Sequence, residues 1–210
     1  MKKLMINCIL AVLFLVMGRV QADLMNGGFE TGDLTGWTFS VPSGASAKVV
    51  SSHTEDFGSS TWAPTEGDHF ALLKTDGLNS WCTLEQSFSG AAGDVVSFDY
   101  FFDWGDYTPF DDQSYGRLLN SSGAVVRQFF YWGQGGTLLS PNFSNKGWSS
   151  ESFILTEEGV YTLKFGIKND GDCCFDSYMG IDAAVVPVPS GILLAMLGVS
   201  VTGIKLRKFA

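Results

Sequence analysis

The sequence has 210 residues, of which 22 are Asp or Glu and 13 are Lys or Arg. Six of the cationic residues lie within residues 1–22 or 187–210, which leaves seven in residues 23–186 against all 22 carboxylates, a net charge of −15. Such an acidic domain repels phosphate backbones, so the composition excludes nucleic acid as a partner. Residues 23–186 are enough for one domain with a sizeable core and too few for two.

Residues 1–22 have the organisation of a secretory signal peptide. Two cations, Lys2 and Lys3, precede an apolar run over residues 4–17, and small residues lead to a cleavage site after Ala22. We therefore expect removal of residues 1–22 and export of the remaining chain, with a retained N-terminal membrane anchor as the alternative.

The segment 24–37 follows directly and is interrupted every few residues by Gly, Asn or Asp. This spacing excludes a helix and predicts a short strand followed by turns. Phe29, Leu34 and Trp37 are the apolar residues expected in the core.

After residue 37 the pattern favours strands almost throughout. Residues 94–104 form the richest aromatic and β-branched run, and apolar and polar residues alternate cleanly over 160–168. Residues 132–148 are rich in Gly, Ser and Asn, which predicts a long loop. No segment has sustained helical periodicity, so we predict an all-β jelly-roll sandwich of about nine or ten strands over residues 23–186. The expected strands are 47–50, 69–75, 81–88, 94–104, 115–119, 124–131, 150–155, 160–168 and 177–186.

Four cysteines are present, and Cys8 lies within the signal peptide. Export permits disulfides, and adjacent cysteines bridge each other only with strain. We therefore expect Cys82 to pair with Cys173 or Cys174, which leaves one thiol over. The alternative is three buried thiols without a bond.

The C-terminal 24 residues have three parts. Pro187 and Pro189 end the domain, because neither can donate to a strand ladder or continue a helix. Residues 191–204 carry no charge and span about 21 Å as a helix, shorter than the roughly 30 Å hydrocarbon core of a bilayer. Three cations follow and favour the cytoplasmic side. They are Lys205, Arg207 and Lys208.

Pro187-Val188-Pro189-Ser190, the short apolar run and the basic cluster together resemble the PEP-CTERM sorting signal of Gram-negative bacteria, with Val188 where the family name has Glu. The resemblance implies a short transmembrane sorting helix over residues 187–210 and processing by exosortase. It also implies an inner-membrane intermediate before delivery to the cell surface or the extracellular space. The alternatives are a plain C-terminal membrane anchor and an apolar helix packed on the domain.

Two motifs at opposite ends of the domain carry a second resemblance. Asn26-Gly-Gly-Phe-Glu30 with Gly36-Trp37, and the closing Asp176-Ser177 with Ile181-Asp182, resemble the first and last strands of galactose-binding-like jelly rolls, which include many carbohydrate-binding modules. The resemblance implies that these two ends of the domain meet.

In that family the meeting point holds a structural calcium ion. By resemblance, its ligands here are the Gly28 carbonyl, the carboxylates of Glu30 and Asp182, and an acid from the turn at Glu66 or Asp68. Mixed carboxylate and carbonyl oxygens suit Ca²⁺. The alternative makes Glu30 a solvated turn residue and Asp182 a strand cap.

Aromatic residues next to polar ones predict a ligand surface, because sugars stack on aromatic rings while carboxylates and amides bind their hydroxyls. Trp104, Asp106 and Tyr107 follow the richest strand, and Trp132 and Gln134 follow another. The alternative places these rings in the core and the acids in solvent, or uses the acids around Asp106 for a second calcium ion.

Catalytic motifs are absent from the sequence. His53 and His69 are the only histidines, and no G-x-S-x-G, H-E-x-x-H or P-loop spacing occurs. We therefore expect a non-catalytic exported protein that binds polysaccharide or exopolysaccharide in the extracellular matrix. A structural or adhesive surface protein without sugar affinity is the alternative, and a glycoside hydrolase is the third hypothesis.

Overall fold

The structure is a computed structural model that describes residues 24–107, 109–110, 112–133 and 145–186. These residues form twelve strands and no helix. The strands are β1 (Thr38–Ser40), β2 (Ser46–Val50), β3 (His53–Thr54), β4 (Thr61–Trp62), β5 (Phe70–Lys74), β6 (Cys82–Gly90), β7 (Val95–Asp103), β8 (Gln113–Asn120), β9 (Val125–Trp132), β10 (Asn145–Ile154), β11 (Gly159–Lys168) and β12 (Tyr178–Val185).

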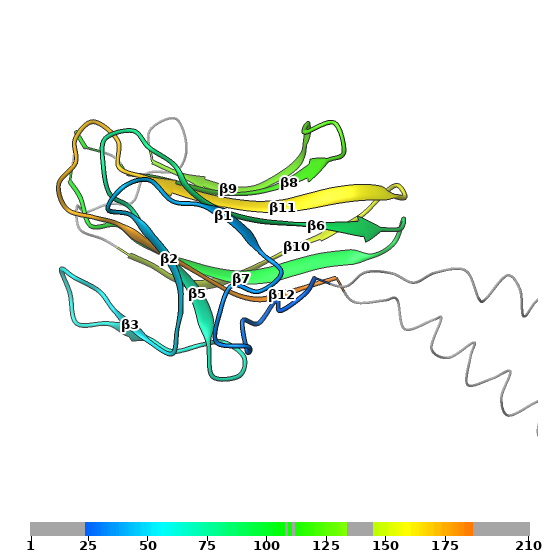
Figure 1. Ribbon diagram of the computed structural model, residues 1–210, viewed down its shortest axis with the longest axis horizontal. Helices are drawn as coiled ribbons and strands as arrows, with labels where there is room; N and C mark the ends of the chain where they lie inside the picture. The colour runs from blue at the N-terminus through cyan, green and yellow to red at the C-terminus, as the bar shows by residue number, and fades with distance from the viewer. Residues whose placement is uncertain (1–23, 108, 111, 134–144, 187–210) are drawn as a thin grey trace, which may run out of the picture.

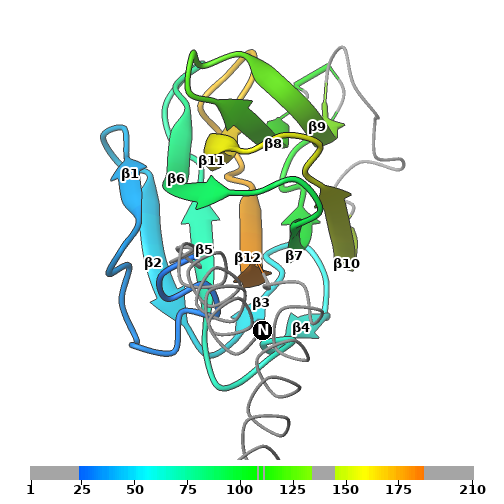
Figure 2. The ribbon, with the colours of Figure 1, turned by 90° about the vertical axis from the view of Figure 1, so that its right-hand side faces the viewer.

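Two five-stranded antiparallel sheets lie face to face, as Figure 1 shows. Sheet A has the order β1-β6-β11-β8-β9, and sheet B has the order β10-β7-β12-β5-β2. In Figure 2 the five strands of sheet B are seen side by side in this order. The prediction of an all-β, two-sheet sandwich is confirmed, and each of the nine expected strands has a counterpart. The long loop expected over residues 132–148 is wrong at its end, because β10 already begins at Asn145.

The opening segment and three short strands differ from the expectation. Residues 24–30 form turns, and the first strand is β1 at residues 38–40. β3 and β4 pair as a small separate hairpin of two residues each, too short to show a strand period in the sequence. The first and last segments of the domain still meet, because the Ala184 amide donates to the Gly27 carbonyl at 3.0 Å.

The main core lies between the two sheets. Phe29 and Trp37 are 0% and 6% exposed, and Leu34 packs against the same cluster, as predicted for these three residues. A second, smaller cluster lies on the opposite face of sheet B beneath the β3–β4 hairpin, where Trp62 stacks on Phe101 with ring centroids 4.7 Å apart. Sheet B is therefore covered on both faces at one end.

The cysteines do not form the expected bond. Cys82 is fully buried in the core, whereas Cys173 and Cys174 lie exposed on the loop between β11 and β12, and all three are free thiols. The alternative of three buried thiols is also incorrect, because only one is buried. Burial raises the pKa of the Cys82 thiol to about 11.

The predicted signal peptide and sorting segment, residues 1–22 and 187–210, lie outside the described residues. Within the described part of the chain, no helix has the length and apolarity needed to cross a bilayer.

Candidate functional site

The outer face of sheet A carries an ordered set of aromatic side chains. Trp81, immediately before β6, packs on Tyr115 of β8 with ring centroids 4.8 Å apart. Tyr115 lies across Gly166 of β11, where a Cβ atom would come within 2.5 Å of its ring. The Arg117 guanidinium lies 4.2 Å from the centre of the Tyr115 ring and 6.0 Å from that of Tyr131 on β9. Cation–π contacts therefore hold Arg117 between Tyr115 and Tyr131.

Polar groups continue from the rings at one end of this surface. The Tyr131 hydroxyl donates to Gln113 Oε1, and Gln113 Nε2 donates to Asp170 Oδ2 at 2.7 Å. Lys168 Nζ pairs with Asp170 Oδ1 at 3.0 Å and lies 5.4 Å from the centre of the Trp81 ring. We call this surface the aromatic face and define it by six residues. They are Trp81, Gln113, Tyr115, Arg117, Tyr131 and Asp170.

The aromatic face has the chemistry of a surface that binds sugars. Trp81 and Tyr131 are partly exposed and offer ring surface, whereas Tyr115 is only 6% exposed and supports the rings beside it. In Figure 1 the connecting loops at both ends of sheet A rise above its outer face. These loops therefore border the aromatic face at both ends of the strands. Flat apolar rings with polar donors and acceptors at their margin can stack on a pyranose and bind its hydroxyls.

The ligand residues expected from the sequence lie elsewhere. Trp104 and Asp106 are 3% and 0% exposed, so neither forms an accessible platform. Trp132 is partly buried and packs against the core between the sheets. Gln134 lies outside the described residues. The core alternative therefore describes Trp104, and the aromatic face supplies the exposed rings.

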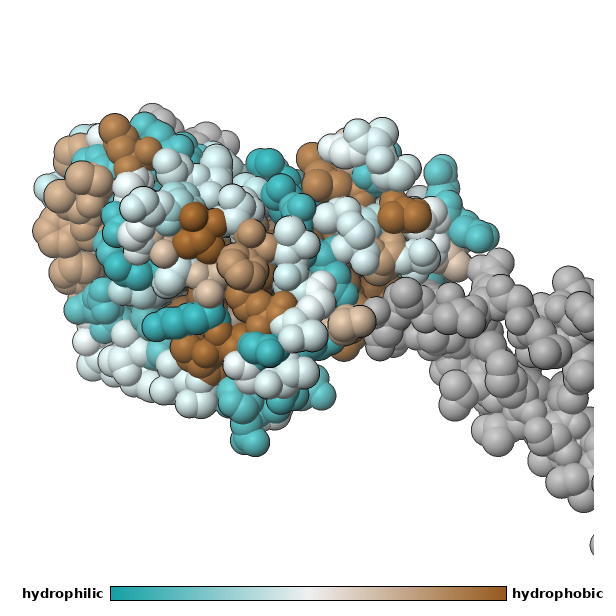
Figure 3. All heavy atoms as spheres, in the orientation of Figure 1, coloured by the Kyte–Doolittle hydropathy of each residue, from teal (hydrophilic) through white to brown (hydrophobic). Residues whose placement is uncertain are grey.

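Tyr107 alone of these expected aromatic residues joins an exposed group of rings. Its ring centroid lies 5.5 Å from that of Phe110 and 6.0 Å from that of Phe175. Phe175 in turn contacts Phe57, and these two side chains are 44% and 48% exposed. Figure 3 shows apolar side chains gathered at the end of the domain where the β11–β12 loop lies.

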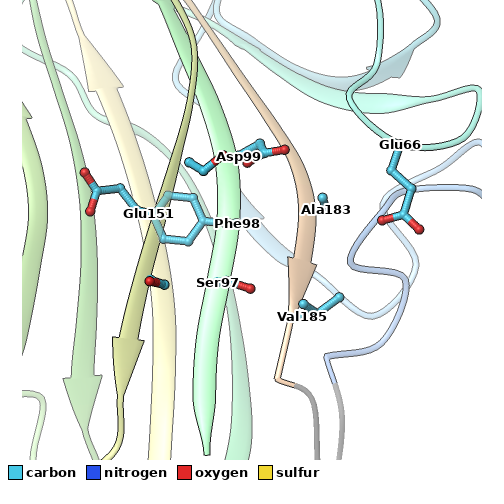
Figure 4. A pocket seen from close by; sticks show the side chains of 9 residues that line it. Glu66, Ser97, Phe98, Asp99, Glu151, Ala183 and Val185 are labelled. Carbon is cyan, nitrogen blue, oxygen red and sulfur yellow. The ribbon is translucent and has the colours of Figure 1, made fainter.

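A polar hollow of about 370 Å³ lies on the opposite sheet, sheet B. Figure 4 shows Glu66 and Glu151 on opposite sides of it, with β7 and β12 between them. Its only aromatic side chain, Phe98, is 1% exposed, so the hollow offers no ring for a sugar to stack on. The lining residues are Glu66, Ser97, Phe98, Asp99, Ser150, Glu151, Ser152, Ala183 and Val185.

The residues expected to hold calcium meet at the loop of residues 65–69. Glu30 accepts hydrogen bonds from the backbone amides of Asp68 and His69 at 3.1 and 3.0 Å. These bonds, with the Asp68 amide as the largest contribution, lower the pKa of Glu30.

Asp182 accepts hydrogen bonds from the other end of the same loop. Its Oδ2 accepts from the amide and hydroxyl of Thr65 at 2.7 and 3.0 Å and from the amide of Glu66 at 3.1 Å. Its Oδ1 accepts from the amide of Ala183 at 2.7 Å. Burial raises the pKa of Asp182, although these hydrogen bonds act in the opposite direction.

In the structure the carboxylates of Glu30 and Asp182 bind backbone amides of the 65–69 loop. Across the described ranges, no three His, Cys, Asp or Glu side chains are grouped so as to hold a metal ion. Calcium bound by Gly28, Glu30, Glu66, Asp68 and Asp182 therefore stays a prediction.

Comparison with known proteins gives the fold and no family. No protein-family model matches the sequence, and no curated protein matches it. The K2 cleaved adhesin domain of Lys-gingipain has a similar structure, with a TM-score of 0.50 and 16% identity over 80% of this chain and 99% of that domain. TmCBM61 in complex with β-1,4-galactotriose has a TM-score of 0.47 and 16% identity over 80% of this chain and 99% of that one.

The enzymatically active domain of tailspike protein 4 from bacteriophage CBA120 gives a TM-score of 0.45 at 9% identity over 77% of this chain. This chain spans only 20% of the length of that protein. At such identities the likeness concerns the fold alone. The protein belongs to the class of two-sheet β-sandwiches and has an aromatic surface on one sheet.

Proposed function

We propose that the domain is a non-catalytic module that binds carbohydrate on the aromatic face. The observation that carries the proposal is the set Trp81, Tyr115 and Tyr131, which three separate strand regions bring to one outer surface with Arg117 across two of the rings. Aromatic surface beside hydrogen-bonding groups is the usual means of binding a sugar ring and its hydroxyls.

The domain is acidic as a whole, but the aromatic face carries one cation, Arg117, that no described carboxylate pairs, and this local charge favours a sugar that carries a carboxylate. Lys164 and Lys168 are paired with Glu85 and Asp170, at 2.7 and 3.0 Å. Arg117 forms no ion pair with any described carboxylate, and its Nε donates to Gln128 Oε1 at 3.3 Å. A uronate carboxylate can take the remaining guanidinium donors as a charge-assisted pair.

Glycan binding by variants tests the proposal. Affinity electrophoresis in neutral and uronic-acid polysaccharides should show retardation of the wild-type protein, and Trp81→Ala or Tyr131→Ala should each weaken binding about three- to tenfold. Phe57→Ala removes an aromatic side chain that is 48% exposed outside the face and should bind as wild type does. Thermal unfolding of each variant checks that the fold is intact.

Two results would contradict the proposal. Equal retardation of the wild-type, Trp81→Ala and Tyr131→Ala proteins would remove the aromatic face as the binding surface. A folded wild-type protein that is retarded by no polysaccharide would leave a structural or adhesive role. If the wild-type protein binds both kinds of polysaccharide, Arg117→Gln should bind neutral polysaccharides as wild type does and lose affinity for uronic-acid polysaccharides.

We also propose that the protein is exported and sorted by exosortase to the cell surface or extracellular matrix, passing transiently through the inner membrane. This proposal is supported by the cationic, apolar start before Ala22 and by the Pro187-to-Lys208 segment. Mass spectrometry of the exported protein should show a new N-terminus at Asp23 and loss of the C-terminal segment. An exported chain that still ends at Ala210 would contradict sorting by cleavage.

A further inference from the structure

One end of the sandwich contains a layer of polar side chains between the two sheets. The β8–β11 register pairs Gln113 with Lys168, so continuing it by one residue places Asp112 opposite Asn169. Asp112 and Asn169 are 1% and 0% exposed, and the Asp170 amide donates to Asp112 Oδ1 at 3.2 Å. Opposite residues of an antiparallel pair share a face, so both side chains point into the space between the sheets.

Side chains from the same strand and from sheet B complete the layer. Ser114 is 0% exposed and lies two residues from Asp112, hence on the same face of β8. Ser177, just before β12, donates from its hydroxyl to Asp112 Oδ2 at 2.5 Å and accepts from the Gly105 amide at 2.9 Å. We call this group the buried polar layer. Its residues are Asp106, Asp112, Ser114, Asn169 and Ser177.

Asp112 is a buried acid that forms no ion pair with a cation among the described residues. Asp106 is 0% exposed and follows Gly105, whose amide donates to the same Ser177 hydroxyl that donates to Asp112. Among the described residues, no Lys or Arg forms an ion pair with Asp112, and the nearby Lys168 is paired with Asp170. A carboxylate buried without a counter-charge is strongly disfavoured.

Neutral polar atoms in the same layer also lack partners. The side-chain amide of Asn169 has no hydrogen bond at either Oδ1 or Nδ2, and the Ser114 hydroxyl has none. Both residues are fully buried. Buried polar groups are almost always hydrogen-bonded or bound to an ion or water, so these atoms indicate that the layer surrounds an ion or a buried water.

We propose that the buried polar layer binds a calcium ion. Two carboxylates, the Asn169 carbonyl oxygen and the hydroxyls of Ser114 and Ser177 form an all-oxygen donor set of mixed charge, which suits a hard divalent cation. Neutral oxygens supply most of the ligands, so the site needs no third acidic side chain. Sulfur and imidazole donors are absent from the layer, which makes it unsuited to zinc or copper.

This site is separate from the calcium position expected at the 65–69 loop. It lies where the loop after β7 and the loop after β11 meet, directly behind Gln113 and Asp170 of the aromatic face. The ion would tie these two loops together. Counting bound calcium requires no glycan, so the inference stands or fails independently of the proposed carbohydrate binding.

Equilibrium dialysis of the folded protein with radioactive calcium tests the inference. The wild-type protein should bind one ion more than Asp112→Asn, which keeps the size and shape of the side chain and removes its charge. Asp182→Asn alters the other expected position and should retain the ion in the buried polar layer. Near-ultraviolet circular dichroism checks that each variant is folded.

A second pair of variants tests the layer should Asp112→Asn fail to fold. Asn169→Asp adds a carboxylate and should tighten calcium binding at least tenfold, whereas Ser114→Ala removes one ligand and should weaken it. Equal stoichiometry and affinity in the wild-type protein and in the folded variants would overturn the inference. So would a folded wild-type protein that binds no calcium.

Discussion

Truncation of Asp182 to alanine should destabilise the domain more than any other change at the 65–69 loop. The Asp182 side chain is 0% exposed and accepts four hydrogen bonds. Three come from the backbone amides of Thr65, Glu66 and Ala183, and the fourth comes from the Thr65 hydroxyl. Alanine would leave these four donors without a protein acceptor.

The magnitude follows from what water can and cannot replace. Hydrogen bonds to a charged group contribute about 1.5–3 kcal/mol each, so four would contribute about 6–12 kcal/mol. Thr65 and Glu66 are exposed, so water can replace much of the loss there, and truncation also removes the desolvation cost that raises the pKa of Asp182. We expect a net loss of about 3–4 kcal/mol in the free energy of unfolding, or about 10 °C in Tm for a domain of this size.

Thermal and urea unfolding of Asp182→Ala against the wild-type protein measure this loss. Asp68→Ala changes an exposed acid of the same loop whose amide, not its side chain, bonds to Glu30, so it should stay within about 0.5 kcal/mol of wild type. A Tm for Asp182→Ala within 2 °C of wild type would refute the reasoning. If calcium binds at this loop, chelator should lower the wild-type Tm more than that of Asp182→Ala; equal shifts would place any calcium effect elsewhere.

Two further predictions concern backbone contact and thiol chemistry. Gly27→Ala should lower the free energy of unfolding in urea by about 3 kcal/mol or more, because a Cβ atom would lie 1.7 Å from the Ala184 carbonyl oxygen. As the control, Gly28→Ala should be nearly neutral, because its Cβ atom would meet no atom closer than 3.8 Å. Equal stabilities of the two variants would contradict the close approach at Gly27. At pH 8, iodoacetamide should label the exposed Cys173 and Cys174 in the folded protein and leave the buried Cys82 unmodified. Burial also raises the pKa of Cys82 to about 11, so little of its thiolate is present at this pH. Labelling of Cys82 at the same rate as the other two would contradict its burial.

Much of the sandwich is predictable because its strands follow a simple period. In β11 the side chains of Tyr161, Leu163, Phe165 and Ile167 are buried and alternate with Thr162 and Lys164, which are partly exposed. The same logic located the other long strands, and Phe29 and Trp37, expected in the core as large apolar residues of the opening segment, are buried. Local pattern is sufficient where one face of a strand is buried and the other is solvated.

The period fails in β7, and this explains the misplacement of Trp104. Residues 100–104 are buried in succession, because the main core covers one face of the strand and the β3–β4 hairpin covers the other. When both faces of a strand are covered, its sequence no longer indicates which aromatic residues are exposed. The hairpin over residues 53–62, whose two strands of two residues each cannot be predicted locally, therefore determines the burial of the chain's richest aromatic run.

The aromatic face escaped prediction for a different reason. Trp81, Tyr115 and Tyr131 come from distant parts of the chain and meet only through the strand order β6-β11-β8-β9. The available signal was the alternation along β8, where Tyr115 and Arg117 share one face with Gln113. That signal identifies the face of one strand but not its neighbours.

The position of β12 has a consequence for how the polypeptide reaches its folded state. This strand is the last of the domain, yet it lies at the middle of sheet B between β7 and β5. During synthesis, neither neighbour can complete its ladder until residues 178–185 have emerged. Premature closure is thereby prevented, and a chain interrupted before this point would expose two open strand edges that invite aggregation or proteolysis.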